Sequence, residues 1–153
     1  MPPKTRFPNY RQIPKPQQKQ EFFKLKINEL KPTQMCVGFS EVWSRQKEFS
    51  NETYEQRLEY LRSKPIPIVR TTENKLWMLD RHHRLKALIE IDKEAEGFGY
   101  LVEEINTQHE SIVLDYLFRQ GWLYLYDNRG RGPQSKQSLP KSLLELEDDP
   151  YRS

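Results

Sequence analysis

Four basic side chains stand next to one another in the string DRHHRLKAL, where the pattern predicts that a helix begins at Asp80. The first turn of that helix then contains Arg81, His82, His83 and Arg84. The N–H groups of a first turn lack partners within the helix and the macrodipole is positive there, so each exposed cation costs about 0.3–1 kcal/mol. Asp80 as the N-cap can accept from the N–H of His82 or His83, but one carboxylate does not balance this set. We therefore expect a bound anion: a phosphate held by helix N–H groups, by Arg84 and by one charged histidine.

Two other interpretations of this string stay open. Asp80 can be a cap and nothing more, and adjacent histidines point about 100 degrees apart on a helix, so one of His82 and His83 can be an ordinary surface or core residue. A histidine pair can also bind a metal ion, although such pairs prefer a spacing of three or four residues. The one other histidine of the sequence is His109.

The elements that must position this string follow from hydrophobic periodicity. Phe23, Leu25 and Ile27 alternate with lysines and predict a strand, which ends before a loop at Pro32. The further expected elements are helices 41–49 and 54–62, a hairpin of strands 65–70 and 75–79, a helix from 80 to about 92, a strand over 98–105, a helix over 111–120, a flexible loop 127–138 with Arg129, Arg131 and Lys136, and a short last helix opened by Pro140 and ended by Asp148, Asp149 and Pro150. The sum is an α+β domain with a small mixed β-sheet flanked by helices.

The composition narrows the class of protein. A chain of 153 residues forms one domain, and hydrophobic residues make up only 35% of it, so we expect part of the chain to lie outside the core. The sequence contains no apolar run of membrane-spanning length and its N-terminus does not resemble a signal peptide, which predicts a soluble cytoplasmic protein. The single cysteine, Cys36, excludes an internal disulfide framework and a zinc site built from several thiolates.

Charge divides the chain at residue 20. Residues 1–20 carry five basic residues, no acid and five prolines, whereas residues 21–153 have a net charge of −2. We expect 1–20 to be a basic, proline-rich, flexible arm and 21–153 to be the folded domain. Phe7 and Tyr10 lie among the cations and suit stacking on bases or docking onto another protein. The arm is therefore either a solvated tail or a contact for such a partner.

Several strings together resemble a known family. DRHHRLKAL follows a strand, ELKPTQMCVG precedes it by some fifty residues, and LP, SLLEL and DDPYRS follow near the end. In this combination, over about residues 22–153, the chain resembles the putative ParB-like nucleases of the ParB/sulfiredoxin superfamily. The resemblance implies an α+β fold in which a helix N-terminus binds nucleotide phosphates. The matching turn is Gly-Gly-Cys-His-Arg on ATP in sulfiredoxin and Gly-Glu-Arg-Arg on CTP in ParB, and free-serine kinases carry a His-His-Arg version.

The resemblance assigns roles residue by residue. His83 and Arg84 fall on phosphate-binding positions, and His82 falls on the catalytic cysteine of sulfiredoxin, so sulfinic-acid chemistry is not implied. Arg81 stands where relatives have a glycine that lets the backbone approach phosphate. The glutamate base of the serine kinases is matched by Thr33-Gln34, and an amide cannot take a proton. As bases or magnesium ligands there remain Glu41, Asp80, Asp148 and Asp149, the last two being equally suited to ending a helix.

The sequence thus predicts a nucleotide-binding protein, with ATP or CTP and Mg²⁺ as ligands and with transfer or hydrolysis of the terminal phosphoryl group as its chemistry. The expected catalytic residues are His82, His83 and Asp80, and the expected phosphate-binding residues are Arg81, His83, Arg84, Gln34 and Thr33. The first alternative is a ParB-like nuclease or nucleic-acid-binding protein that uses the basic arm. Against DNA cleavage stands the acidic net charge of 21–153, which attracts polyanions poorly. The second alternative is an anion-binding module without catalysis.

Overall fold

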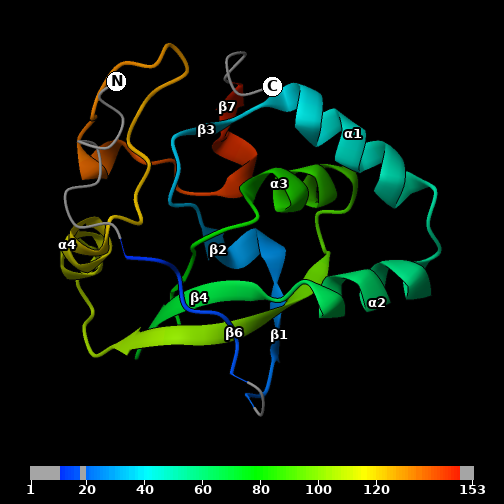
Figure 1. Cartoon of the computed structure of the whole chain (residues 1–153), viewed down its shortest axis with the longest axis horizontal. Coiled ribbons are helices and arrows are strands. Elements are labelled where there is room, and N and C mark those ends of the chain that lie inside the picture. Colours follow the sequence, from blue (N-terminus) through cyan, green and yellow to red (C-terminus); the bar gives the residue numbers. More distant parts are fainter. Residues whose placement is uncertain (1–10, 18–19, 149–153) are drawn as a thin grey trace.

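The computed structural model describes residues 11–17 and 20–148 (Figure 1). The strands of this part are β1 (Phe23–Lys26), β2 (Leu30–Lys31), β3 (Cys36–Val37), β4 (Ile66–Thr71), β5 (Leu76–Met78), β6 (Glu96–Ile105) and β7 (Glu147–Asp148). Its α-helices are α1 (Phe39–Ser50), α2 (Tyr54–Ser63), α3 (His82–Ile91) and α4 (Glu110–Gln120). Within the described ranges, no helix has the length and apolar character needed to cross a membrane.

The main sheet is mixed, as predicted. Among the described strands, five form it in the order β1-β6-β4-β5-β2. β1 is antiparallel to β6 and β4 is antiparallel to β5, whereas the pairs β4–β6 and β2–β5 are parallel. The hairpin expected from 65–70 and 75–79 is the β4–β5 pair, and the α+β class with a small mixed sheet and flanking helices is confirmed.

Both faces of the sheet are covered, because apolar cores lie on opposite sides of it. In and just after β5, Leu76 and Met78 join the core that includes α3, while Trp77 and Leu79 join the core that includes α4. Successive strand residues point to opposite faces, so a strand covered on both sides is apolar throughout and shows no alternation. Figure 1 shows α1 beside α3, with α4 well apart from both.

The packing of α1 against α3 positions the start of α3. Gln46 on α1 donates to the Glu90 side chain on α3 at 2.8 Å. The Lys86 ammonium, buried on α3, lies 5.7 Å from the centre of the Phe39 ring at the start of α1. The N-terminal ends of both helices therefore open toward the same region, beside the loop that links β2 to β3.

Several expected boundaries are wrong. The last helix is only a 3-10 turn, Leu143–Glu145, followed by β7, because Leu143 and Leu146 are both buried in the α3-side core and a short, tight turn brings both side chains inward. The strands β2, β3 and β7 were not predicted, since two residues show no periodicity. In the loop 127–138, the Asp127 carboxylate accepts from the N–H groups of Arg129 and Arg131, each at 2.9 Å, so this segment is a hydrogen-bonded loop rather than an unconstrained one.

The described part of the basic arm, residues 11–17, lies against the domain. The Arg11 N–H donates to the Gln120 carbonyl at 2.8 Å, and the Tyr100 hydroxyl donates to the Pro14 carbonyl at 2.7 Å. The Trp122 indole N–H also donates to the Arg11 carbonyl. These bonds tie residues 11–17 to the domain because buried donors on the domain need acceptors. Phe7 and Tyr10 lie outside the described residues, and the division of the chain at residue 20 stays a prediction.

Candidate functional site

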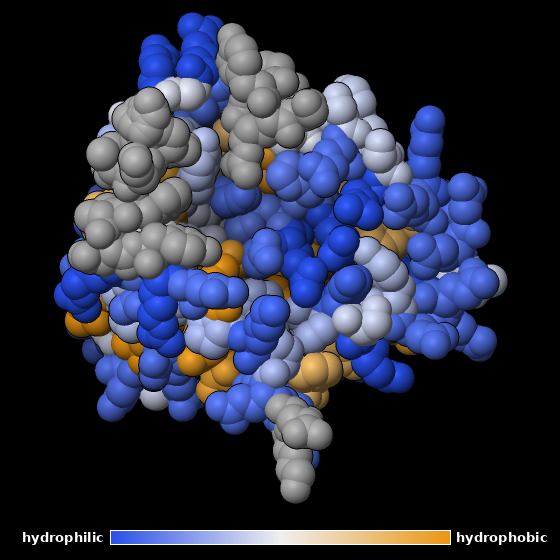
Figure 2. Space-filling model, viewed as in Figure 1, coloured by the Kyte–Doolittle hydropathy of each residue, from blue (hydrophilic) through white to orange (hydrophobic). Residues whose placement is uncertain are grey.

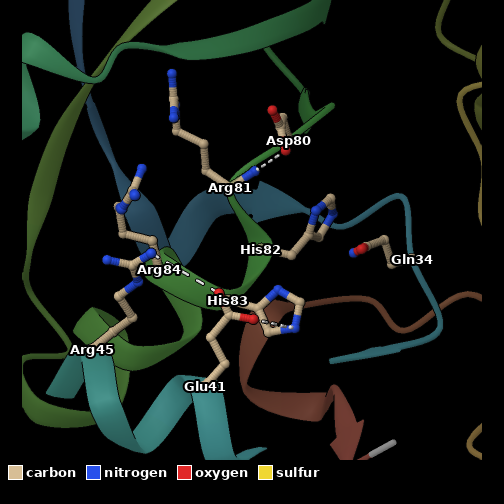
Figure 3. Close-up of a pocket in the computed structure, with 8 residues that line it drawn as sticks. All are labelled: Gln34, Glu41, Arg45, Asp80, Arg81, His82, His83 and Arg84. Atoms are coloured by element: carbon tan, nitrogen blue, oxygen red, sulfur yellow. Dashed lines mark hydrogen bonds and ion pairs between the residues drawn. The ribbon is translucent and has the colours of Figure 1, made fainter. Parts of the chain in front are cut away.

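A cavity of about 260 Å³ opens at the start of α3. Its walls come from the β2–β3 loop, from the first turns of α1 and from the β5–α3 junction. The residues that line it are Gln34, Glu41, Arg45, Asp80, Arg81, His82, His83 and Arg84. Figure 2 shows strongly hydrophilic residues gathered in the middle of this face, over the start of α3 and the side of α1. The structure thus brings together most of the residues singled out in the sequence (Figure 3).

The turn into α3 differs from the one predicted. Arg81 is the N-cap, with a left-handed φ of 75°, and its carbonyl accepts the first helical bond from the Leu85 N–H at 3.0 Å. Asp80 lies one residue too early to cap the helix, so its carboxylate accepts from the Arg81 N–H at 2.7 Å instead. The prediction of Asp80 as N-cap is therefore wrong. A left-handed conformation costs a residue with a side chain about 1–2 kcal/mol, so Arg81 occupies a backbone position that favours glycine.

His82 is almost fully buried, with 3% of its surface exposed. Its Nε2 atom accepts from the Thr33 N–H at 3.0 Å, and the Thr33 hydroxyl donates to the Met78 carbonyl at 3.0 Å. A ring nitrogen that accepts a hydrogen bond carries no proton, so the His82 imidazole is neutral and its proton is on Nδ1. Through these bonds, His82 and Thr33 link the β2–β3 loop to α3. The expected catalytic role of His82 and the expected phosphate-binding role of Thr33 stay predictions.

His83 has a matching arrangement one residue later. Its Nε2 atom accepts from the N–H of Gly38, the N-cap residue of α1, at 2.9 Å. The same atom lies 3.8 Å from a Glu41 carboxylate oxygen, but it cannot donate to that oxygen while it accepts from Gly38. The expectation of a charged histidine among the phosphate donors stays a prediction. In this geometry the two Nε2 atoms accept from backbone N–H groups and brace α1 and its preceding loop against α3.

The positive charge of the cavity comes from arginines. Arg84 is half-buried, its guanidinium lies 5.2 Å from the centre of the Tyr60 ring, and its buried Nε has no hydrogen-bond partner among the described residues. Burial lowers the pKa of the Arg84 guanidinium from its ordinary value; Tyr60 opposes this shift, and the charges of Arg45 and Arg81 add to it. Arg81 donates through Nε to the Pro65 carbonyl at 3.0 Å.

Arg45 is the functional candidate that the sequence reasoning missed. It follows Glu41 by four residues on α1, so both side chains lie on one helix face, and Arg45 Nη2 is 3.9 Å from a Glu41 carboxylate oxygen. That spacing, next to the α1 N-terminus, was the available signal. Among the described residues that line the cavity, three arginines stand against the carboxylates of Glu41 and Asp80, and with neutral imidazoles the net charge of this lining is +1.

The remaining predicted residues have different places. The Gln34 side chain reaches from its loop toward the two imidazoles (Figure 3). Val37 on β3 pairs with Asp148 on β7. Asp149 lies outside the described residues. Across the described ranges, no three or more histidine, cysteine, aspartate and glutamate side chains group as metal ligands, and a magnesium role for Asp148 and Asp149 stays a prediction.

Comparisons with known proteins show the family of the chain and a solved structure with the same fold. Residues 23–153 match the model of the family described as "Putative ParB-like nuclease". Among solved structures, the chain is similar to the crystal structure of protein Atu1540 from Agrobacterium tumefaciens, with a TM-score of 0.74 and 22% identity. This match covers 88% of the present chain and 65% of that chain, and at this identity it shows a shared fold alone. No curated protein matches the sequence.

Proposed function

The chain belongs to the "Putative ParB-like nuclease" family, and from this premise we propose that it binds the phosphate groups of a nucleotide in the cavity at the start of α3. The observation that carries the proposal is the environment of Arg84. Its Nε is buried without a partner in the described part of the chain, and Arg45 and Arg81 line the same cavity. A buried, unpaired donor costs about 1–3 kcal/mol, and a phosphate oxygen would remove that cost.

The backbone supports the same ligand. α3 has no acidic residue in its first turn and no side-chain cap among the described residues. The orphan N–H groups of a first turn and the positive end of the macrodipole favour a phosphate at this point. Three guanidinium groups line the same cavity and can donate to a phosphate. Arg84 comes from α3 and Arg45 from α1, so donors from two helices can bind one phosphate.

The chemistry proposed for the bound nucleotide is hydrolysis or transfer of its terminal phosphoryl group. Because the Nε2 atoms of His82 and His83 accept from backbone N–H groups, their lone pairs are not available to take a proton. Glu41 is the better candidate base, since its half-exposed carboxylate lines the cavity. Magnesium belongs to the proposal as the ion that accompanies the phosphates, as it does in most phosphoryl transfer.

The test of phosphate binding is a thermal-shift panel of ATP, CTP, GTP and ADP with Mg²⁺ on the full chain. We expect at least one nucleotide to raise the Tm of the parent and to lose this effect in Arg84→Ala. Arg62→Ala is the matched control, because Arg62 also stacks on an aromatic ring, Phe98 at 4.9 Å, but does not line the cavity. A parent that no nucleotide stabilises, or an Arg84→Ala variant that responds like the parent, would refute the proposal.

A variant of Glu41 separates binding from catalysis. Glu41→Gln keeps the size of the side chain and removes the base, so we expect nucleotide binding to persist and phosphate release to fall at least tenfold. If the parent binds nucleotide and releases no phosphate with any acceptor tried, the protein is an anion-binding module without catalysis.

The family description also favours a second candidate function, binding or cleavage of nucleic acid. This function would need a basic footprint, and residues 1–10 contribute Lys4 and Arg6 to one. Affinity for DNA or RNA would then fall steeply with salt and drop on deletion of residues 1–10, whereas mononucleotide binding would not respond to the deletion. Cleavage of a labelled oligonucleotide by the parent but not by Arg84→Ala would favour the nuclease.

A further inference from the structure

A second cavity of about 160 Å³ adjoins the arginine-lined one. The two share Gln34, Asp80 and His82 as lining residues, so they lie side by side, and we call the pair the cleft. The second half has a different chemistry, because its other walls include Ile13, Leu79, Trp122, Leu123 and Tyr124 and none of the arginines. The cleft therefore passes from a cationic end to an apolar and aromatic end.

We propose that this aromatic cavity is a subsite for the base of the nucleotide whose phosphates occupy the arginine-lined cavity. The inference rests on the proposed phosphate site and adds the part of the ligand that gives selectivity. A nucleotide combines a polyanionic end with a flat, uncharged, partly polar ring. The arginine-lined cavity matches the polyanionic end, and the aromatic cavity matches the ring.

The size and lining of the subsite suit such a ring. A cavity of about 150 Å³ holds a benzene-sized molecule, so one heterocyclic ring fits into 160 Å³. Leu79, Trp122 and Leu123, each about 5% exposed, form a rigid apolar wall. Gln34 stands at the junction with an amide that both donates and accepts, which is the pairing that base edges require.

Tyr124 is the candidate stacking residue. It is half-buried, and its ring lies 5.5 Å from the ring of Tyr126, tilted by 52°. Its backbone is fixed against the β2–β3 loop, because the Tyr124 N–H donates to the Thr33 carbonyl at 2.9 Å. Backbone bonds thus hold Tyr124 in register with the same loop that His82 braces, so the two halves of the cleft are built as one unit.

The N-terminal segment supplies the remaining wall. Ile13 lines the cavity and packs against the core on the α4 side of the sheet. The bonds from Tyr100 to the Pro14 carbonyl and from Trp122 to the Arg11 carbonyl hold the chain on both sides of Ile13. Residues 11–17 therefore take part in the subsite as a preformed wall.

The experiment compares inorganic tripolyphosphate with ATP, CTP and GTP, each with Mg²⁺, by calorimetric titration of the full chain. We expect at least one nucleotide to bind the parent more tightly than tripolyphosphate does. Tyr124→Ala should weaken that nucleotide about tenfold or more, the scale of one base–aromatic stack, and leave the Kd for tripolyphosphate unchanged. Tyr124→Phe should keep the parent affinity.

Tyr126→Ala is the control, since Tyr126 is the neighbouring ring but does not line the cavity. Ile13→Ala provides a second, smaller loss if Tyr124→Ala does not fold.

The outcomes distinguish the two proposals. Equal affinities for tripolyphosphate and every nucleotide, or an equal loss for both kinds of ligand in Tyr124→Ala and Ile13→Ala, would overturn the base subsite and leave the phosphate site standing. Failure of the parent to bind tripolyphosphate and all nucleotides would overturn the phosphate site, and the base subsite with it.

Discussion

Arg84 combines two features that folded proteins normally avoid. Its Nε is buried without a hydrogen-bond partner among the described residues, and Arg45 and Arg81 stand in the same cavity. Stacking on Tyr60 offsets part of the cost but does not satisfy the N–H donor. A residue in this state reduces the stability of the free protein, and the phosphate that we propose as ligand would satisfy the Arg84 donor.

This conflict between stability and binding is testable with Arg84→Met, which keeps the length of the side chain and removes its charge and donors. Without ligand, we expect the free energy of unfolding to rise by about 1 kcal/mol, because an unpaired buried donor is lost. Stabilisation by nucleotide should disappear. Urea unfolding with and without nucleotide measures both effects. Arg57→Met is the control, because Arg57 also has a buried Nε without a partner among the described residues but does not line the cavity. Nucleotide should stabilise this variant as it stabilises the parent. Loss of stability in Arg84→Met would instead assign Arg84 a structural role.

His82 is expected to act on stability first. His82→Ala leaves the buried Thr33 N–H without its acceptor and opens a cavity, so the free energy of unfolding should fall by about 2–4 kcal/mol. His82→Gln can place an amide oxygen near the same N–H and should restore part of the loss. The measurement is chemical unfolding of the three proteins. A His82→Ala variant of parental stability that has lost phosphate release would favour the catalytic role predicted from the sequence.

At the scale of elements, the sequence predicts those parts that have a period. Helices α2 and α4 and the β4–β5 hairpin lie within one or two residues of their expected ranges, since apolar spacing and turn residues mark them. The two-residue strands, the 3-10 turn Leu143–Glu145 and the left-handed Arg81 have no periodic signal and depend on tertiary contacts. Asp80 and His82–Arg84 could be proposed as a site because they stand in one string, whereas the Glu41–Arg45 spacing indicates only an ion pair on one helix until the packing of α1 on α3 is known.

The loop that begins at Asp127 gives a prediction on pH. The N–H groups of Arg131 and Arg129 hold the pKa of the Asp127 carboxyl below its ordinary value of 3.8. The ionised carboxylate is favoured in the folded loop, so its contribution is complete above pH 3.8 and is lost as the pH falls through the lower folded value. We expect the N–H signals of Arg129 and Arg131 to titrate together in this acid range, as followed by NMR. In Asp127→Asn this transition should be absent; its persistence would assign it to another group.

For the whole molecule, the site lies where separate parts of the chain meet. The β2–β3 loop, α1, the β5–α3 junction and the N-terminal segment 11–17 all contribute to the cleft, although they are far apart in the sequence (Figure 1). The family match over residues 23–153 and the structural likeness at a TM-score of 0.74 agree on the α+β fold that carries these parts. The central claim is that a nucleotide phosphate sits at the start of α3.

An NMR titration of the labelled full chain with Mg²⁺-nucleotide tests this claim most directly. We expect saturable shifts that are largest for the backbone N–H groups of residues 82–84 and for the Arg84 and Arg45 Nε–H groups, with no such response in Arg84→Ala. A full titration that leaves these signals in place, or that moves mainly signals remote from α3, such as those around Lys136 and Lys141, would contradict the claim.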